Sequence, residues 1–132
     1  MKIAAVSEDG ITISHHFGRA PFYIVVTVEN DEIVSREKRD KWSHTHFAGE
    51  AHAEGEDLRG HGFDPAAQSR HAGMAATIAD CQLLLARGMG AGAYESMRQA
   101  GIRPVVTDIA SIDDAIQAYL AGTLVDHIEK LH

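Results

Sequence analysis

Nine of the 132 residues in this sequence are histidines. A neutral imidazole binds iron, copper and zinc, so these residues are the first candidates for metal binding. Two of them stand side by side in the stretch SHHFGRAPFY, residues 14–23. Adjacent residues of an extended segment point to opposite sides, so only one of His15 and His16 is expected to reach a shared ligand. The alternative for either is a solvated side chain. Arg19 could balance an anionic ligand, or could simply lie on the surface.

A glycine-rich stretch, RGMGAG at residues 87–92, lies between an apolar run and a helical pattern. Gly88, Gly90 and Gly92 would let backbone N–H groups approach a ligand, and the N-terminus of the following helix would favour an anion. Met89, within the loop, either packs in the interior or faces a soft metal. The spacing matches neither a P-loop nor a dinucleotide-binding motif. The alternative is therefore a tight strand-to-helix turn.

Residues 40–68 form a long segment that is rich in histidine, glycine and acidic residues and shows no period. His44 and His46, together with His71 just beyond it, are candidate metal ligands, although no spacing matches a closed zinc site. The other residues that could contribute ligands are His52, His61, Glu50, Glu54, Glu56 and Asp57. This pattern allows a buffer or sensor for a divalent metal such as zinc, copper or nickel. The alternative is a flexible, solvated loop, and for His71 a packed side chain on an apolar helical face.

The elements that must position these residues follow from the apolar patterns. Strands are predicted at residues 2–7, 21–29, 32–39, 81–86 and 103–108, and helices from about 69 to 78, 93 to 100 and 111 to 121. Ser111 starts a capping box, and Gly101 and Gly122 should end the helices before them. Three strands in succession followed by β-α-β units predict a mixed sheet with helices on both faces.

The predicted topology brings the chemical stretches to one edge of the sheet. Strands one and three run the same way if strand two is antiparallel between them, and strand four should lie parallel to strand one. The loops that leave these three strands then open at the same edge, where open α/β sheets bind ligands. We therefore expect residues 14–20 and 87–92 to be two walls of one site.

Composition and charge exclude several classes of partner. The net charge of −7 disfavours nucleic acid, which needs a basic face. The basic run SREKRDK at 35–41 is interrupted by acids and is interpreted as a solvated strand end. No apolar run approaches the ~20 residues of a membrane span, and the N-terminus is polar too early for a signal peptide. The single cysteine, Cys81, allows no disulfide within the chain and is expected to be an inert core residue, which favours a reducing cytoplasm. The length of 132 residues predicts a single domain, residues 1–132.

Three stretches together resemble a known family. HFGRAPFY after the first strand, CQLLLARGMGAGAYESMRQAGI, and the final SIDDAIQAYLAGTL are similar to the dinitrogenase iron–molybdenum cofactor biosynthesis family, which includes nitrogenase cofactor carriers and the molybdenum–copper orange protein. The resemblance covers about residues 1–35 and 70–124. It implies a ribonuclease H-like fold with strand order 3-2-1-4-5, no nuclease activity, and binding of a metal–sulfur cluster or its precursor. The cluster type would be iron–molybdenum, molybdenum–copper or iron–sulfur.

The resemblance also implies which residues meet the cluster. The histidine of the family's His-Phe-Gly motif falls on His16. The residues expected to contact the cluster are His16, Phe17, Gly18, Arg19, Gly88, Met89, Gly90 and Gly92. Cluster donor and acceptor proteins, in a setting related to nitrogen fixation, are the implied partners. The chain departs from the family at Arg87 and Ala91, where many members carry glycine and proline.

Catalysis is not expected. No nucleophile and base stand at a recognisable spacing. Nuclease chemistry of the ribonuclease H type needs several carboxylates around magnesium, and the predicted strand ends offer only Asp9 and Asp108. The sequence therefore predicts a binding or carrier protein rather than an enzyme.

Overall fold

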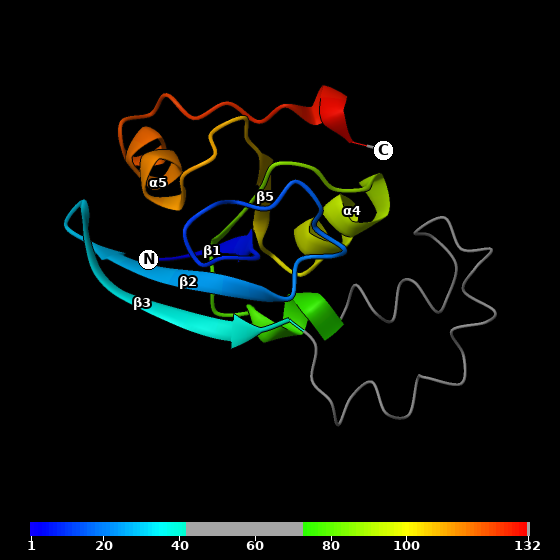
Figure 1. Cartoon of the computed structure of the whole chain (residues 1–132), viewed down its shortest axis with the longest axis horizontal. Coiled ribbons are helices and arrows are strands. Elements are labelled where there is room, and N and C mark those ends of the chain that lie inside the picture. The colour runs from blue at the N-terminus through cyan, green and yellow to red at the C-terminus, as the bar shows by residue number, and fades with distance from the viewer. Residues whose placement is uncertain (42–72, 132) are drawn as a thin grey trace.

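The computed structural model describes residues 1–41 and 73–131, and these residues build a five-stranded sheet (Figure 1). The strands are β1 (Lys2–Ser7), β2 (Phe22–Glu29), β3 (Glu32–Asp40), β4 (Leu83–Ala86) and β5 (Arg103–Val106). Their order in the sheet is β3-β2-β1-β4-β5. Strand β2 is antiparallel to both of its neighbours, whereas β4 lies parallel to β1 and β5 parallel to β4. The predicted mixed sheet with strand order 3-2-1-4-5 is confirmed.

Strand β3 forms one edge of the sheet and is joined to β2 by a tight hairpin. The two residues of the turn, Asn30 and Asp31, both have positive φ, at 53° and 63°, as two-residue hairpins require. Most side chains of β3 are charged and exposed, which protects an open edge from pairing with another chain. The edge position of this strand, which the predicted strand order implies, is confirmed. The interpretation of residues 35–41 as a solvated run is wrong for Lys41, which is buried.

Helices cover both faces of the sheet, as the strand register shows. Arg36, which lies opposite Val26, donates to Asp113 of α5 (Ile112–Leu120), with 3.0 Å between Nη2 and Oδ2. Arg39, which lies opposite Tyr23, donates to the carbonyl of Thr77 in the helical segment 73–77. Because side chains alternate between faces along β2, Val26 and Tyr23 face opposite sides. Figure 1 accordingly shows α5 and the green helical segment on opposite sides of β2 and β3.

The central strands are buried on both faces. All four residues of β4 are buried, as expected for a parallel strand covered on both sides. Helix α4 (Ala91–Gln99) connects β4 to β5 and ends before Gly101, which has φ of 83°. Cys81 lies just before β4, and burial raises the pKa of its thiol to about 11. The thiol therefore stays protonated near neutral pH.

Two further predictions concern membrane crossing and the histidine-rich segment. None of the helices in the described ranges has the length and apolar character to cross a membrane. Residues 42–68 of the predicted histidine-rich segment 40–68, with His44 and His46, lie outside the described residues, and so does His71.

Helix α5 begins with the predicted cap, which gives a first testable result. The hydroxyl of Ser111 accepts the N–H of Asp114 at 3.2 Å, so Ser111→Ala should lower the free energy of unfolding by about 1 kcal/mol. Urea denaturation followed by circular dichroism measures this change. Ser35→Ala is the matched control, because Ser35 is exposed in β3 and its loss should stay within about 0.5 kcal/mol. Equal effects at the two positions would contradict the assignment of the cap.

Candidate functional site

The two stretches that carry the predicted chemistry are joined directly at the carboxyl ends of β1 and β4. We call residues 14–20 the His-Phe-Gly loop and residues 87–92 the glycine loop. The N–H of Phe17 donates to the carbonyl of Gly88 at 3.0 Å, and the N–H of Arg87 donates to the carbonyl of Ser14 at 3.0 Å. A Cβ atom at Gly88 would lie 2.3 Å from the carbonyl oxygen of His15. The contact is backbone against backbone, so only glycine fits at this position.

The His-Phe-Gly loop is a compact turn that presents both imidazoles to solvent. The N–H groups of Arg19 and Ala20 both donate to the carbonyl of His16 at 3.0 Å. The N–H of His16 donates to the Ser14 hydroxyl at 3.1 Å. His15 and His16 are exposed, with ring centroids 6.4 Å apart and planes tilted by 54°. The two rings are therefore not stacked, and both are accessible.

Phe17 is the residue that fixes this loop to the interior. Its side chain is only 2 % exposed, and the ammonium of Lys41 lies 4.0 Å from its ring centroid, a favourable cation–π distance. Lys41 follows β3, so the third strand also ends at this edge of the sheet, as the topology predicted. Burial lowers the pKa of Lys41 to about 7. The sequence analysis did not include Lys41 in the candidate site. The one indication was that Lys41 follows the third strand, which was expected to end at the same edge of the sheet as the two loops.

The glycine loop leads into the N-terminus of α4. Gly90 is the N-cap residue and no acidic side chain stands in the first turn, so the positive end of the helix dipole is not neutralised there. Gly92 is buried within that turn, and Met89 is buried with 2 % exposure. Met89, like Phe17, therefore holds its loop in place from the inside. Within the two loops, the exposed residues are His15, His16, Gly18 and Arg19.

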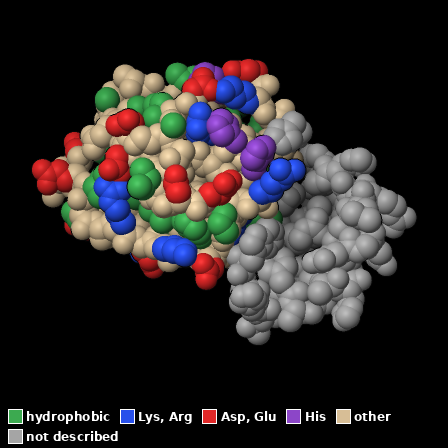
Figure 2. Space-filling model, in the orientation of Figure 1, with side chains coloured by type: hydrophobic (Ala, Val, Ile, Leu, Met, Phe, Trp, Pro, Cys, Tyr) green, Lys and Arg blue, Asp and Glu red, His purple; other side chains and the backbone are tan. Residues whose placement is uncertain are grey.

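Arg87 places a further cation at the junction of the two loops. The sequence analysis named this residue only as a departure from the family. The residue is half-buried, and its Nε atom is buried without a hydrogen-bond partner among the described residues. Its backbone is held at the junction through Ser14. The histidines of the described ranges are His15, His16 and His127. On the face that Figure 2 shows, histidine side chains lie beside lysine and arginine side chains.

The cavity next to the imidazoles contains two acids, and both are already engaged. It has a volume of about 240 Å³ and is lined by Glu8, Asp9, Thr12, Ile13, Ser14, His15 and His16. Asp9 accepts the N–H groups of Thr12 and Ile11, which lowers its pKa to about 2. Glu8 accepts the Ser14 hydroxyl at 3.0 Å. Within the described residues, no group of three His, Cys, Asp or Glu side chains is arranged to hold a metal ion.

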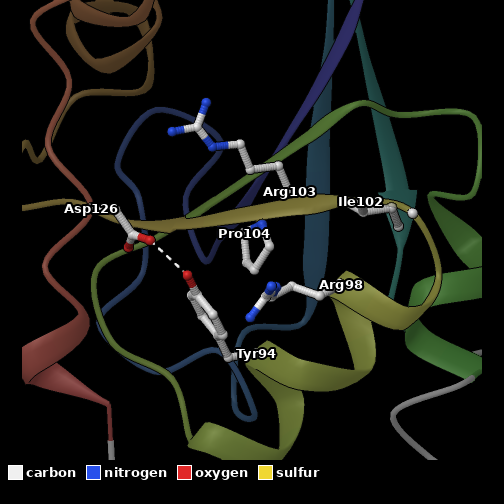
Figure 3. A pocket seen from close by; sticks show the side chains of 7 residues that line it. Tyr94, Arg98, Ile102, Arg103, Pro104 and Asp126 are labelled. Carbon is white, nitrogen blue, oxygen red and sulfur yellow. Dashed lines mark hydrogen bonds between the residues drawn. The ribbon is translucent and has the colours of Figure 1, made fainter.

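A second hollow lies beside the far end of α4 and contains none of the predicted site residues. It has a volume of about 610 Å³ and is lined by Tyr94, Arg98, Gly101, Ile102, Arg103, Pro104 and Asp126 (Figure 3). The phenol of Tyr94 donates to Asp126 at 2.7 Å across this hollow. This bond anchors the C-terminal part of the chain to α4.

Solved structures share this fold. The chain is similar to the crystal structure of PH0822, with a TM-score of 0.66 and 24% sequence identity, covering 98% of this chain and 96% of that one. It is also similar to the apo form of the orange protein from Desulfovibrio gigas, with a TM-score of 0.64 and 20% identity, covering 96% and 92% of the two chains.

A sequence relative and a family model extend the comparison. The chain is 27% identical to the uncharacterized protein MJ0580 of Methanocaldococcus jannaschii over 124 residues, which is 94% of this chain and 89% of the relative. The family model described as "Dinitrogenase iron-molybdenum cofactor" matches residues 1–122. This match includes both loops of the candidate site and every described element except the C-terminal 3₁₀ turn η2 (Ile128–Lys130). The chain therefore belongs to the dinitrogenase iron-molybdenum cofactor family.

Proposed function

We propose that this protein binds an anionic metal–sulfur cluster, or a precursor of one, and carries it or helps to assemble it without catalysing a reaction. The observation that carries the proposal is the junction of the two loops, where Gly88 lies against His15. That junction joins the loop that carries two exposed imidazoles to the loop that leads into the N-terminus of α4. Imidazole nitrogen suits iron and copper, and the positive end of the helix favours an anion.

The charged residues around the junction fit an anionic cargo. Arg19 is exposed at the loop, and Arg87 has a buried Nε atom that meets no hydrogen-bond partner in the described part of the chain. A thiometallate core is negatively charged, so guanidinium groups at this edge would offset its charge. The cluster would be a cargo that passes between donor and acceptor proteins, which would dock at the same edge. An iron–molybdenum, molybdenum–copper or iron–sulfur core would each satisfy this chemistry.

A carrier role is also supported by what the carboxylates at this edge do. Asp9 holds its own loop through two backbone N–H groups. Asp108 pairs with Lys130 and His127. Neither is therefore available as one of the several open ligands that metal-dependent hydrolysis needs. The family, and the likeness of the fold to the orange protein, support the same non-catalytic function.

The test is anaerobic titration of the purified chain with tetrathiomolybdate and copper(I), followed by visible absorption. His16→Ala should weaken uptake about tenfold, the scale of one lost charge-assisted contact of ~1.5 kcal/mol. The thermal midpoint should change little, because the ring is exposed. Iron–sulfur uptake is measured in the same way with a ferrous iron and sulfide mixture.

The histidine-rich segment supplies the control. A His44→Ala, His46→Ala double variant should leave cluster uptake within about twofold of the unmodified chain. A zinc titration of both variants addresses the alternative, a divalent-metal buffer. Unchanged cluster uptake by His16→Ala, combined with loss of zinc binding in the double variant, would replace the carrier proposal by the buffer.

A further inference from the structure

The C-terminal segment, residues 123–131, crosses the end of β5 and is hydrogen-bonded to β5 and to helix α4. The N–H of His127 donates to the carbonyl of Val106 at 2.7 Å. The carboxylate of Asp126 accepts the N–H of Val106 at 2.9 Å and the hydroxyl of Tyr94 at 2.7 Å (Figure 3). In Figure 1 this segment runs from α5 past β5 toward α4. It also lies beyond the residues that the family model matches.

Asp108 is the acid that this segment neutralises. Nε2 of His127 lies 3.1 Å from one carboxylate oxygen of Asp108, and Lys130 forms an ion pair with the other oxygen. Lys130 is the main cause of the lowered pKa of Asp108. Nδ1 of His127 lies 2.9 Å from Glu129, so the histidine is held between two carboxylates.

Arg87 lies close to the same acid without pairing with it. Arg87 follows Ala86, whose carbonyl accepts the N–H of Thr107 at 2.8 Å, so Arg87 and Asp108 leave the paired strands β4 and β5 at the same end. In agreement with this placement, the charge of Arg87 contributes to the lowered pKa of Asp108. Asp108 pairs instead with His127 and Lys130, and the Nε atom of Arg87 lacks a hydrogen-bond partner within residues 1–41 and 73–131. A guanidinium next to a carboxylate that had lost its partners would pair with it, because that geometry is strong and bidentate.

We propose that His127 and Lys130 hold Asp108 away from Arg87 and so keep the Arg87 guanidinium available to an anionic cargo. The C-terminal segment then sets the charge that the cargo meets at the glycine loop. This inference rests on the proposed function, and it assigns Arg87 as a further anion-binding residue.

The first experiment measures the state of Arg87 without any cargo. Modification of Arg87 by phenylglyoxal is followed by mass spectrometry in the unmodified chain, in His127→Ala with Lys130→Ala, and in that double variant with Asp108→Asn added. Modification should slow about three- to tenfold in the double variant, in which Asp108 is free to pair with Arg87. It should recover when Asp108 is removed. An unchanged rate in the double variant would overturn the proposal.

The second experiment measures binding of tetrathiomolybdate alone to the same proteins. The affinity for tetrathiomolybdate should fall about three- to tenfold in the double variant and return to within about twofold of the unmodified chain in the triple variant. Adding Arg87→Gln should lower the affinity about tenfold in both the unmodified chain and the triple variant. Arg98→Gln is the matched control, since it removes one exposed cation paired with Glu95 and touches neither Asp108 nor the loops. Its affinity should stay within about twofold.

The two readouts separate the failure of this inference from the failure of the proposed function. If phenylglyoxal modification responds as expected but the unmodified chain takes up no thiomolybdate, the proposed function fails, and the role of Arg87 in cargo binding fails with it. If the unmodified chain binds thiomolybdate, His16→Ala weakens this binding, and the His127→Ala, Lys130→Ala variant binds normally, only the present inference is overturned. Thermal midpoints of all variants, measured by circular dichroism, establish that each one is folded.

Discussion

Alanine at position 88 should destabilise the protein by about 3 kcal/mol, a value at the upper end for overpacking a buried site. The added Cβ atom would lie 2.3 Å from the carbonyl oxygen of His15. A flexible side chain could move aside, but here the obstacle is backbone, so one of the two loops must shift. That shift would break the backbone hydrogen bonds that the N–H of Phe17 donates to Gly88 and the N–H of Arg87 donates to Ser14. Binding of the anionic cargo should be lost together with stability.

The matched control is alanine at Gly18, where an added Cβ atom would meet nothing within 4 Å. Urea unfolding followed by circular dichroism gives both free energies, and the Gly18→Ala protein should stay within about 0.5 kcal/mol of the unmodified chain. If Gly88→Ala is as stable as Gly18→Ala and still takes up thiomolybdate, the backbones of the two loops do not meet at Gly88.

Stability should rise by about 2 kcal/mol between pH 7 and pH 9 because of Lys41. Burial lowers the pKa of this lysine from 10.5 to about 7 in the folded protein. Across this window the unfolded chain holds the proton and the folded chain has released it, so each rise in pH favours folding. The penalty for burying the charge is fully present below the folded pKa and disappears as the pH approaches the unfolded pKa. Above pH 9 the thiol of Cys81, whose pKa is raised by burial, begins to oppose the trend.

The measurement is the free energy of unfolding in urea at half-unit steps from pH 6 to pH 9. Lys41→Met removes the charge that lies over the Phe17 ring and leaves an apolar side chain of similar length, so its profile should be flat where that of the unmodified chain rises. Lys38→Met is the control, because Lys38 also lies over an aromatic ring, that of Phe22 at 4.6 Å, but is exposed. A rise that persisted in Lys41→Met would show that another group is responsible.

Much of the fold could be predicted because its signals are local. The β-branched run of β2, the two-residue turn at Asn30 and Asp31, and the cap at Ser111 each depend on neighbours in the sequence. The strand order 3-2-1-4-5 was implied by the resemblance to the family, and the rules of chain connection agree with it. The predicted strands were too long at β4, by Cys81 and Gln82, and at β5, by Thr107 and Asp108.

The candidate site was only partly predictable because its contacts are long-range. The sequence indicated that the His-Phe-Gly loop and the glycine loop share an edge, but not that Gly88 touches the backbone of His15. Lys41 was predicted to be solvated, since nothing near it in the sequence shows that Phe17 will fold against it. The pairing of Asp108 with His127 and Lys130 could not be foreseen either, because it depends on the path of an irregular segment.

The junction of His15 with Gly88 has a consequence for when the protein can act during its own synthesis. The histidines leave the ribosome early, but the glycine loop that completes their surroundings follows only after β4 has been made. Because β1 pairs with β4 across this interval, the two loops meet late, as contacts of high sequence separation generally do. A nascent chain therefore exposes its imidazoles without the geometry that would make them selective. Binding of the proposed cargo at this junction therefore requires a chain in which β4 has already paired with β1.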